Sequence, residues 1–223
     1  MGAPALSGES SGDAHPDDGY RGPKRGADRA VLLAHGAGAD MHAKALTVVA
    51  DALAAAGIPS LRFDFPYRRA GRRAPDRAPV LGAAVRDAAG ELARRSKVAP
   101  ERLVLGGRSM GGRIASIVVA EGTPALGLAL LGYPLHPPGR PDQLRVEHFA
   151  RVAVPVLFVS GTRDAFGTPT ELRRHAKQMK GPLTWSWVDT GDHSFKPLKA
   201  SGISAAAALD GVANAVVEFV TSL

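Results

Sequence analysis

The chain has 223 residues, of which 45% are hydrophobic and 22% are charged, so it can bury the core of one large α/β domain or of two small ones. It has no cysteine, which excludes disulfides, thiolate zinc sites and a cysteine nucleophile. Its net charge is +7, but only 5% of its residues are aromatic and it carries no nucleic-acid-binding motif, so we expect no specific nucleic-acid partner. A solvated basic surface or an acidic substrate is the better explanation of the charge.

Residues 1–28 are rich in glycine, serine, aspartate and proline and show no apolar period, which predicts a disordered segment before a single domain over 29–223. The first residues lack the basic and apolar pattern of a signal peptide, and the longest apolar run, 125–133, is too short to span a bilayer. We therefore expect a cytoplasmic protein without a membrane segment. No pattern predicts its oligomeric state.

Short apolar runs alternate with helical patterns after residue 29. Runs of Val, Leu and Phe of this length are typical of strands buried on both faces. The predicted strands are 30–36, 59–65, 102–107, 125–132, 154–161 and 183–189. The predicted helices are 41–56 behind the N-cap candidate Asp40, 79–95, 110–121, one that starts at the capping box 168–171, and 203–221. This alternation predicts an α/β fold, with a mostly parallel sheet and helices on both of its faces.

A glycine-rich turn, GGRSMGGR, separates the third predicted strand from the third helix. A phosphate-binding loop would need a lysine and a hydroxyl residue where Arg113 and Ile114 stand, and the dinucleotide fingerprint is interrupted by Arg108 and Ser109. The pattern that fits is GxSxG centred on Ser109, which is typical of a strained turn that exposes a nucleophile. In a chain with 26 glycines this motif is weak by itself, because a serine between glycines is more often a plain turn residue.

Acid and base candidates follow this serine in the chain order of a nucleophile elbow. Asp164 comes just after the fifth predicted strand, and His193 follows the sixth. The carboxyl ends of parallel strands meet at one edge of the sheet, so we expect Ser109, Asp164 and His193 to lie close together. The segment HGAGA at 35–39 follows the first strand and offers backbone N–H groups beside the same turn.

Two other aspartates compete for the role of the acid. Asp192 is adjacent to His193, and neighbouring side chains in an extended loop diverge; Asp189 ends a strand whose register the sequence does not specify. Taken singly, an aspartate after a strand is more often a local hydrogen-bonding residue, and a lone histidine is more often structural. The four features in this order nevertheless favour a catalytic constellation with Asp164 as the acid. The remaining histidines lack metal-ligand spacing, so we expect no metal and no cofactor.

Together these segments resemble the α/β-hydrolase superfamily, in particular small bacterial hydrolases of the dienelactone-hydrolase-like branch. Their domain is also similar to a vertebrate testis-expressed protein and to the third regulatory subunit of the non-specific-lethal chromatin complex. The resemblance covers roughly residues 30–200 and rests on LAHGAG, LRFDFPY, GGRSMGGR, LGYPLHPPG, GTRDAFG and GDHSFK. It implies Ser109 as nucleophile, Asp164 as acid, His193 as base, and an oxyanion hole formed by the N–H groups of Ala37 and Met110.

The sequence departs from the superfamily pattern in two places. The superfamily has two strands before the HG-bearing strand, whereas residues 1–29 carry no strand signal, so we expect about six strands with 59–65 near an edge of the sheet. Only residues 133–153 are available for the helical cap that often follows the fourth of these strands, so the cap should be minimal.

The expected function is that of a serine hydrolase acting on a small-molecule acyl substrate, most simply a carboxylic ester, although a lactone, thioester or peptide is compatible. We expect Tyr67, Tyr133 and Phe166 to line its pocket. The arginines of the stretch 67–77 follow the second strand at the edge that carries Ser109, which would favour an anionic substrate. The alternative is an interaction module that keeps the fold without turnover. Nucleic-acid binding through the basic stretch is a third, weaker reading.

Overall fold

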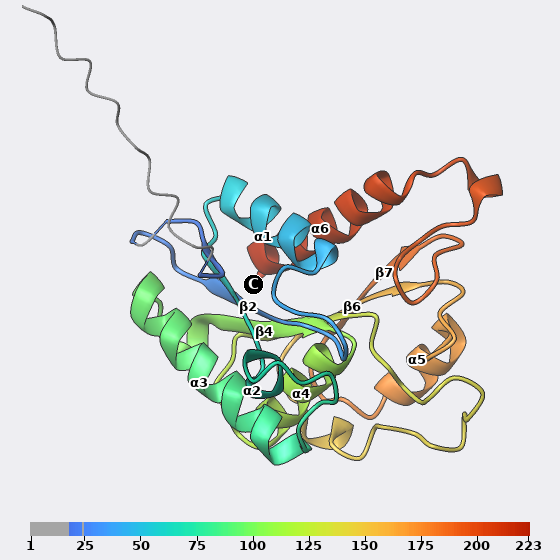
Figure 1. Ribbon diagram of the computed structural model, residues 1–223, viewed down its shortest axis with the longest axis horizontal. Coiled ribbons are helices and arrows are strands. Elements are labelled where there is room, and N and C mark those ends of the chain that lie inside the picture. Colours follow the sequence, from blue (N-terminus) through green and yellow to red (C-terminus); the bar gives the residue numbers. More distant parts are fainter. Residues whose placement is uncertain (1–17, 24) are drawn as a thin grey trace, which may run out of the picture.

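The computed structural model describes residues 18–23 and 25–223, and these form one seven-stranded sheet in the order β1-β3-β2-β4-β5-β6-β7 (Figure 1). The strands are β1 Tyr20–Arg21, β2 Ala30–Ala34, β3 Ser60–Phe63, β4 Leu103–Arg108, β5 Gly127–Leu131, β6 Val156–Gly161 and β7 Leu183–Val188. The helices are α1 Lys44–Ala55, α2 Pro66–Arg69, α3 Ala78–Ser96, α4 Met110–Ala120, α5 Pro169–Ala176 and α6 Ala205–Ser222. Strands β2 to β7 are all parallel. The predicted α/β class is confirmed.

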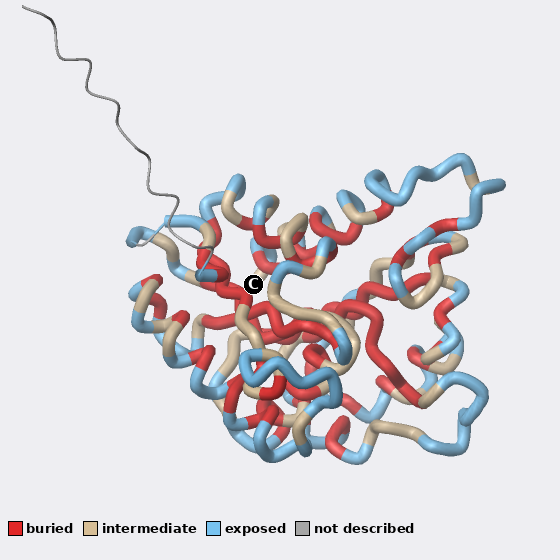
Figure 2. Tube along the Cα trace, viewed as in Figure 1, coloured by how far each residue is buried: buried red, intermediate tan, exposed pale blue. Residues whose placement is uncertain are grey.

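Helices cover both faces of the sheet, with α1 and α6 on one face and α3 and α4 on the other (Figure 1). Strand β2 shows why its sequence is apolar throughout. Leu32 faces the core under α3 and α4, whereas its neighbours Val31 and Leu33 face the core under α1 and α6. Every residue of β2 is completely buried (Figure 2). A strand covered on both sides can be recognised by its unbroken apolar run, which is why the sequence pattern located it.

The sheet has one strand more than the sequence predicted. Strand β1 pairs antiparallel with β3, and its Tyr20 is buried with the guanidinium of Arg95 over its ring. The expectation that no strand precedes residue 30 is therefore wrong, because a two-residue strand is too short to show a period. Residues 1–17 and 24, which hold most of the segment predicted to be disordered, lie outside the described residues.

Two predicted helix starts have different outcomes. The capping box of α5 is confirmed: Thr168 Oγ1 accepts a hydrogen bond from Glu171 N, and the Glu171 carboxylate accepts one from Thr168 N. The start of α1 is wrong by several residues. Asp40 caps a turn by accepting from His42 N at 2.9 Å, and α1 begins only at Lys44.

The last helix, α6, is long and apolar enough to cross a membrane by length and composition alone. In this structure one face of α6 packs against α1 and the sheet, with Val212, Val216 and Phe219 buried.

The predicted minimal cap is also observed. Residues 132–155 are all described, and the 3-10 turn Phe149–Arg151 is their only helical segment.

Candidate active site

Ser109 occupies the turn between β4 and α4 with a strained backbone of φ 50° and ψ −115°. The glycines on either side of it are required by the packing of this turn on β2. A Cβ atom on Gly107 would lie 2.0 Å from the carbonyl oxygen of Ala34, and one on Gly111 would lie 2.2 Å from the same atom. The GxSxG pattern therefore reflects close approach of two backbones, and it leaves the serine side chain at the carboxyl edge of the sheet.

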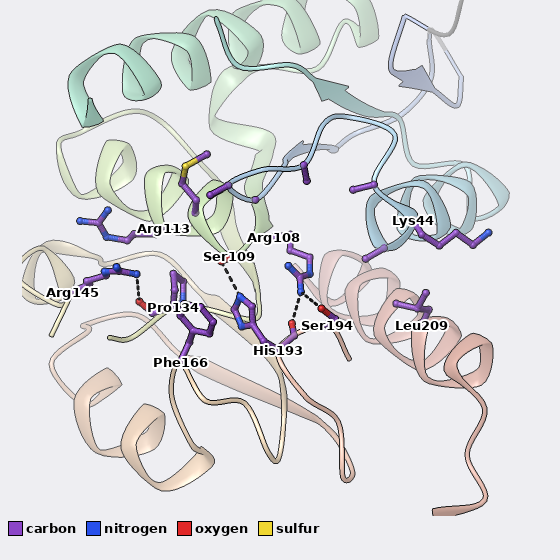
Figure 3. Close-up of a pocket in the computed structure, with 16 residues that line it drawn as sticks. Lys44, Arg108, Ser109, Arg113, Pro134, Arg145, Phe166, His193, Ser194 and Leu209 are labelled. Atoms are coloured by element: carbon purple, nitrogen blue, oxygen red, sulfur yellow. Dashed lines mark hydrogen bonds between the residues drawn. The ribbon is translucent and has the colours of Figure 1, made fainter. Parts of the chain in front are cut away.

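The three residues predicted to act together are brought together, and Figure 3 shows Ser109 and His193 facing each other. His193 Nε2 lies 3.0 Å from Ser109 Oγ, and His193 Nδ1 lies 2.8 Å from Asp164 Oδ2. The Asp164 carboxylate is buried and also accepts a hydrogen bond from Phe166 N at 2.8 Å. The Phe166 ring stacks on the imidazole with their centroids 4.1 Å apart. The imidazole is thus held between a hydroxyl, a carboxylate and an aromatic face.

Strand order explains how residues so distant in sequence meet. Asp164 and His193 follow the adjacent parallel strands β6 and β7, whereas Ser109 follows β4. Strand β5 lies between and must end without filling the space. It ends at Leu131, and the next residue is Gly132, whose φ is +61° and whose added Cβ would lie 3.4 to 3.6 Å from atoms of His193. The role of Gly132 was not foreseen from the sequence, although a glycine directly after a strand is a signal that could have indicated it.

Asp192 and Asp189, the other two candidates for the acid, have no hydrogen bond to the His193 imidazole among the described residues. Asp192 Oδ1 accepts hydrogen bonds from Ser194 N and Lys196 N, at 2.7 and 3.0 Å, so it holds the histidine loop in shape. Asp189 is exposed. The geometry thus favours Asp164 as the partner of the imidazole.

A cavity of about 600 Å³ opens at Ser109 and His193. Phe166 lines it, as expected, but Tyr67 and Tyr133 do not. That part of the prediction is wrong, because both tyrosines are fully buried behind the cavity wall: Tyr67 packs on His35 and Phe65, and Tyr133 donates a hydrogen bond from its hydroxyl to the carbonyl of Arg145 at 2.6 Å. A tyrosine after a strand can point either way, and only its packing decides which.

The two residues expected to supply oxyanion-hole donors both line this cavity. Met110 is the first residue of α4, so its N–H has no acceptor within the helix. Ala37 lies in the exposed turn after β2. His35 supports that turn, since its Nε2 accepts a hydrogen bond from Phe65 N and its Nδ1 lies 2.9 Å from Gly36 O. Burial lowers the pKa of His35, which is consistent with a neutral ring that donates from Nδ1.

Four cationic side chains line the cavity, and the sequence analysis expected none of them there: Lys44, Arg108, Arg113 and Arg145. Two of them belong to the GGRSMGGR motif, but their direction depends on the turn itself. The arginines of the stretch 67–77 were expected near the site instead, and none of them lines this cavity. Arg72 pairs with Asp76 at 2.6 Å and Arg68 with Asp40 at 3.5 Å.

A second serine–histidine contact lies deeper in the molecule. Ser116 Oγ, in α4, is 2.7 Å from His148 Nε2, and both residues are buried away from the cavity. The Ser116 hydroxyl donates to Arg113 O at 2.8 Å, so it accepts from the imidazole. Burial, reinforced by the charge of Arg113, lowers the pKa of His148 to about 4. Among residues 18–23 and 25–223, no cluster of three or more His, Asp or Glu side chains could hold a metal ion.

Comparison with known proteins agrees with this architecture. The chain belongs to the alpha/beta hydrolase domain family, which matches residues 27–221. Among solved structures it is similar to a dienelactone hydrolase from Anabaena variabilis, at 23% identity over 88% of this chain and 87% of that one, with a TM-score of 0.66. It is also similar to an alpha-beta serine hydrolase homologue from Coxiella burnetii, at 18% identity over 89% and 88% of the two chains, with a TM-score of 0.69. A monoacylglycerol lipase from Paleococcus ferrophilus matches at 16% identity over 91% and 97%, with a TM-score of 0.63. At these identities the structural likeness establishes the fold.

Proposed function

We propose that the protein is a serine hydrolase that cleaves small-molecule acyl substrates, with carboxylic esters as the simplest class. The observation that carries this proposal is the pair of contacts from the His193 imidazole, 3.0 Å to Ser109 Oγ and 2.8 Å to Asp164 Oδ2, at the edge of an open cavity. A hydroxyl becomes a nucleophile when a base can take its proton and a third group orients that base.

In the proposed mechanism His193 Nε2 takes the proton of Ser109 as its Oγ attacks the substrate carbonyl. The imidazolium that forms is stabilised by the buried Asp164 carboxylate at Nδ1. The oxyanion would accept hydrogen bonds from the N–H groups of Met110 and Ala37, each contributing a few kcal/mol in the transition state. His193 then protonates the leaving alcohol. Water, activated by the same imidazole, releases the acyl group and restores the serine.

Labelling with a fluorophosphonate probe followed by peptide mass spectrometry tests the proposal, because the probe reacts with activated serines. We expect the native protein to be labelled on Ser109 and the heat-denatured protein to remain unlabelled. Ser109→Ala should abolish labelling. Ser116→Ala is the matched control, since it removes the other histidine-bonded serine and should label normally. Absence of label from the native protein would favour the non-catalytic interaction module, and a label on any other serine would overturn the assignment of the nucleophile.

A further inference from the structure

The cavity at Ser109 is lined by cations. Lys44, Arg108, Arg113 and Arg145 contribute to its wall, and no aspartate or glutamate is among its lining residues. Figure 3 shows Arg113 and Arg145 on one side of the serine–histidine pair and Arg108 and Lys44 on the other. A cation can stabilise the protein itself or meet a ligand, and its contacts distinguish the two roles.

Arg108 is already engaged within the protein. Its guanidinium donates to the carbonyl of His193 and to Ser194 Oγ, and it lies 5.5 Å over the ring of Phe195. It therefore supports the loop that carries the histidine. Lys44 is exposed to solvent at the start of α1. The charge of Arg108 is therefore used within the protein, and the charge of Lys44 is solvated.

Arg113 and Arg145 are half-buried, yet neither forms an ion pair with any residue that the structure describes. The Nε of Arg113 is buried with no hydrogen-bond partner among those residues, and Arg145 reaches the carbonyl of Pro134 only at 3.5 Å. Arg95 differs in this respect, because its side chain, 20% exposed, lies 2.7 Å from the Asp18 carboxylate. Two guanidiniums in the active-site wall thus lack the carboxylate that such groups ordinarily have.

The two arginines also lie close enough for their positive charges to repel each other. The pKa of Arg145 is lowered, first by burial and next by the positive charge of Arg113. The same charge contributes to the low pKa of the neighbouring His148. The exposed Glu147 carboxylate acts in the opposite direction on the pKa of both groups, but it forms no ion pair with Arg145 among the described residues. Two like charges close together still raise the energy of the empty site, and a bound anion would lower it.

Hydrogen bonds of the backbone hold both arginines in place. Arg113 lies in the first turn of α4, and its N–H donates to Ser109 O at 3.0 Å, which fixes its backbone next to the serine. Arg145 comes from the segment between β5 and β6. Its N–H donates to Leu135 O at 2.9 Å, and its carbonyl accepts from the buried Tyr133 hydroxyl at 2.6 Å. The tyrosine that does not line the cavity therefore anchors an arginine that does.

We propose that Arg113 and Arg145 form an anion subsite, and that the ester cleaved at Ser109 carries a carboxylate or phosphate group within a few bonds of its reacting carbonyl. This inference rests on the proposed function and specifies its substrate class. Planar guanidinium groups suit it because they donate paired hydrogen bonds to both kinds of anion.

Three nitrophenyl esters of equal chain length test the subsite. They are 4-nitrophenyl hydrogen adipate, its neutral methyl ester, and the analogue that ends in a phosphonate. We expect the native protein to cleave one or both anionic esters with a higher kcat/KM than the neutral ester, and the better anion identifies the group. Arg113→Gln and Arg145→Gln should each lower that preference about ten- to a hundredfold, mainly through KM. Arg140→Gln removes an exposed charge from the same segment outside the cavity, so it should keep the preference.

A binding measurement separates this inference from the proposed function. Isothermal calorimetry on the Ser109→Ala variant, with phenyl hydrogen adipate as probe, requires no turnover. We expect binding that weakens at least about tenfold on adding Arg113→Gln, and weaker binding of the neutral methyl ester. Turnover of all three esters at equal rates, or equal losses on anionic and neutral esters in the arginine variants, would overturn the subsite while leaving the serine hydrolase intact. Probe binding without any ester hydrolysis by the native protein would support the subsite and contradict the proposed function.

Discussion

The structure contains two serine–histidine pairs whose side-chain contacts are nearly alike, and their serines lie at the start of α4 and two turns further along it. Ser109 Oγ is 3.0 Å from His193 Nε2, and Ser116 Oγ is 2.7 Å from His148 Nε2. Distance alone would assign the nucleophile to the deeper pair. A short hydrogen bond between these side chains therefore does not by itself identify the nucleophile.

The surroundings of the two pairs differ in three ways. His193 has a carboxylate on its second nitrogen and an open cavity beside it, whereas His148 is buried with a depressed pKa and its carboxylate neighbour Glu147 is exposed. Ser109 precedes α4 with its backbone strained, next to N–H groups that have no acceptor within the helix, whereas Ser116 lies inside α4, where the helix uses those groups. A histidine with a low pKa is a weak base, and the buried Ser116 hydroxyl lies away from the cavity, so we expect this pair to stabilise the fold.

Replacement of the two serines should separate these roles most clearly. Ser109→Ala should lower kcat for an activated aryl ester by about three to six orders of magnitude, because the nucleophile is lost, and should leave the thermal midpoint nearly unchanged. Ser116→Ala should retain turnover but lower the free energy of unfolding by about 1–2 kcal/mol, because His148 loses its buried partner. Ester assays and chemical denaturation measure the two effects. Wild-type turnover in Ser109→Ala would contradict the distinction.

The acid should matter only at the pair that carries one. Asp164→Asn should lower kcat by about four orders of magnitude, because an amide favours the wrong tautomer of His193. Asp192→Asn and Asp189→Asn should retain substantially more activity, since the former residue shapes the loop and the latter is exposed. Steady-state kinetics on the three variants provides the measurement. A collapse of activity in one of the two controls with Asp164→Asn near wild type would mean that another carboxylate serves the histidine.

The strained turn at Ser109 should depend on glycine in a way that an ordinary helical position does not. Gly107→Ala should lower the free energy of unfolding by about 3 kcal/mol or more, because the added Cβ would lie 2.0 Å from the Ala34 carbonyl oxygen in a backbone with φ of 146°. Gly90→Ala, at an exposed position in α3 with no atom within 4 Å of the added Cβ, should instead stabilise by about 0.5–1 kcal/mol. Urea denaturation compares them. Equal effects at the two positions would refute the close packing of the turn on β2.

The buried pair of Ser116 and His148 should contribute to the pH dependence of stability. His148 has a folded-state pKa of about 4, below the ordinary value of 6.5 for an unfolded histidine. Between these values the unfolded chain binds a proton that the folded chain does not, so the free energy of unfolding should fall by up to about 2–3 kcal/mol as the pH drops through this window. His148→Gln should remove that part of the dependence, whereas His42→Gln, at an exposed position, should keep it. Identical pH profiles for wild type and His148→Gln would show that His148 is not held neutral.

Local patterns in the sequence were sufficient for much of this protein. The unbroken apolar run of β2 predicted a strand covered on both faces, the capping box predicted the start of α5, and GxSxG predicted a strained turn at Ser109. Each of these depends on residues that are neighbours along the chain, so each leaves a local signal. Placing Asp164 and His193 beside Ser109 needed only one further rule, that parallel strands end at the same edge.

Side-chain direction and pairing between distant segments were decided by the tertiary structure alone. Nothing local distinguishes Phe166, which lines the cavity, from Tyr133, which turns into the core and anchors Arg145. The sequence drew attention to the arginines of the stretch 67–77 because they are clustered, yet the cations that line the cavity come from segments far apart in the chain. A cluster in sequence measures charge per residue, whereas a binding site depends on which side chains share a volume, and that is set by loop conformation, strand register and packing.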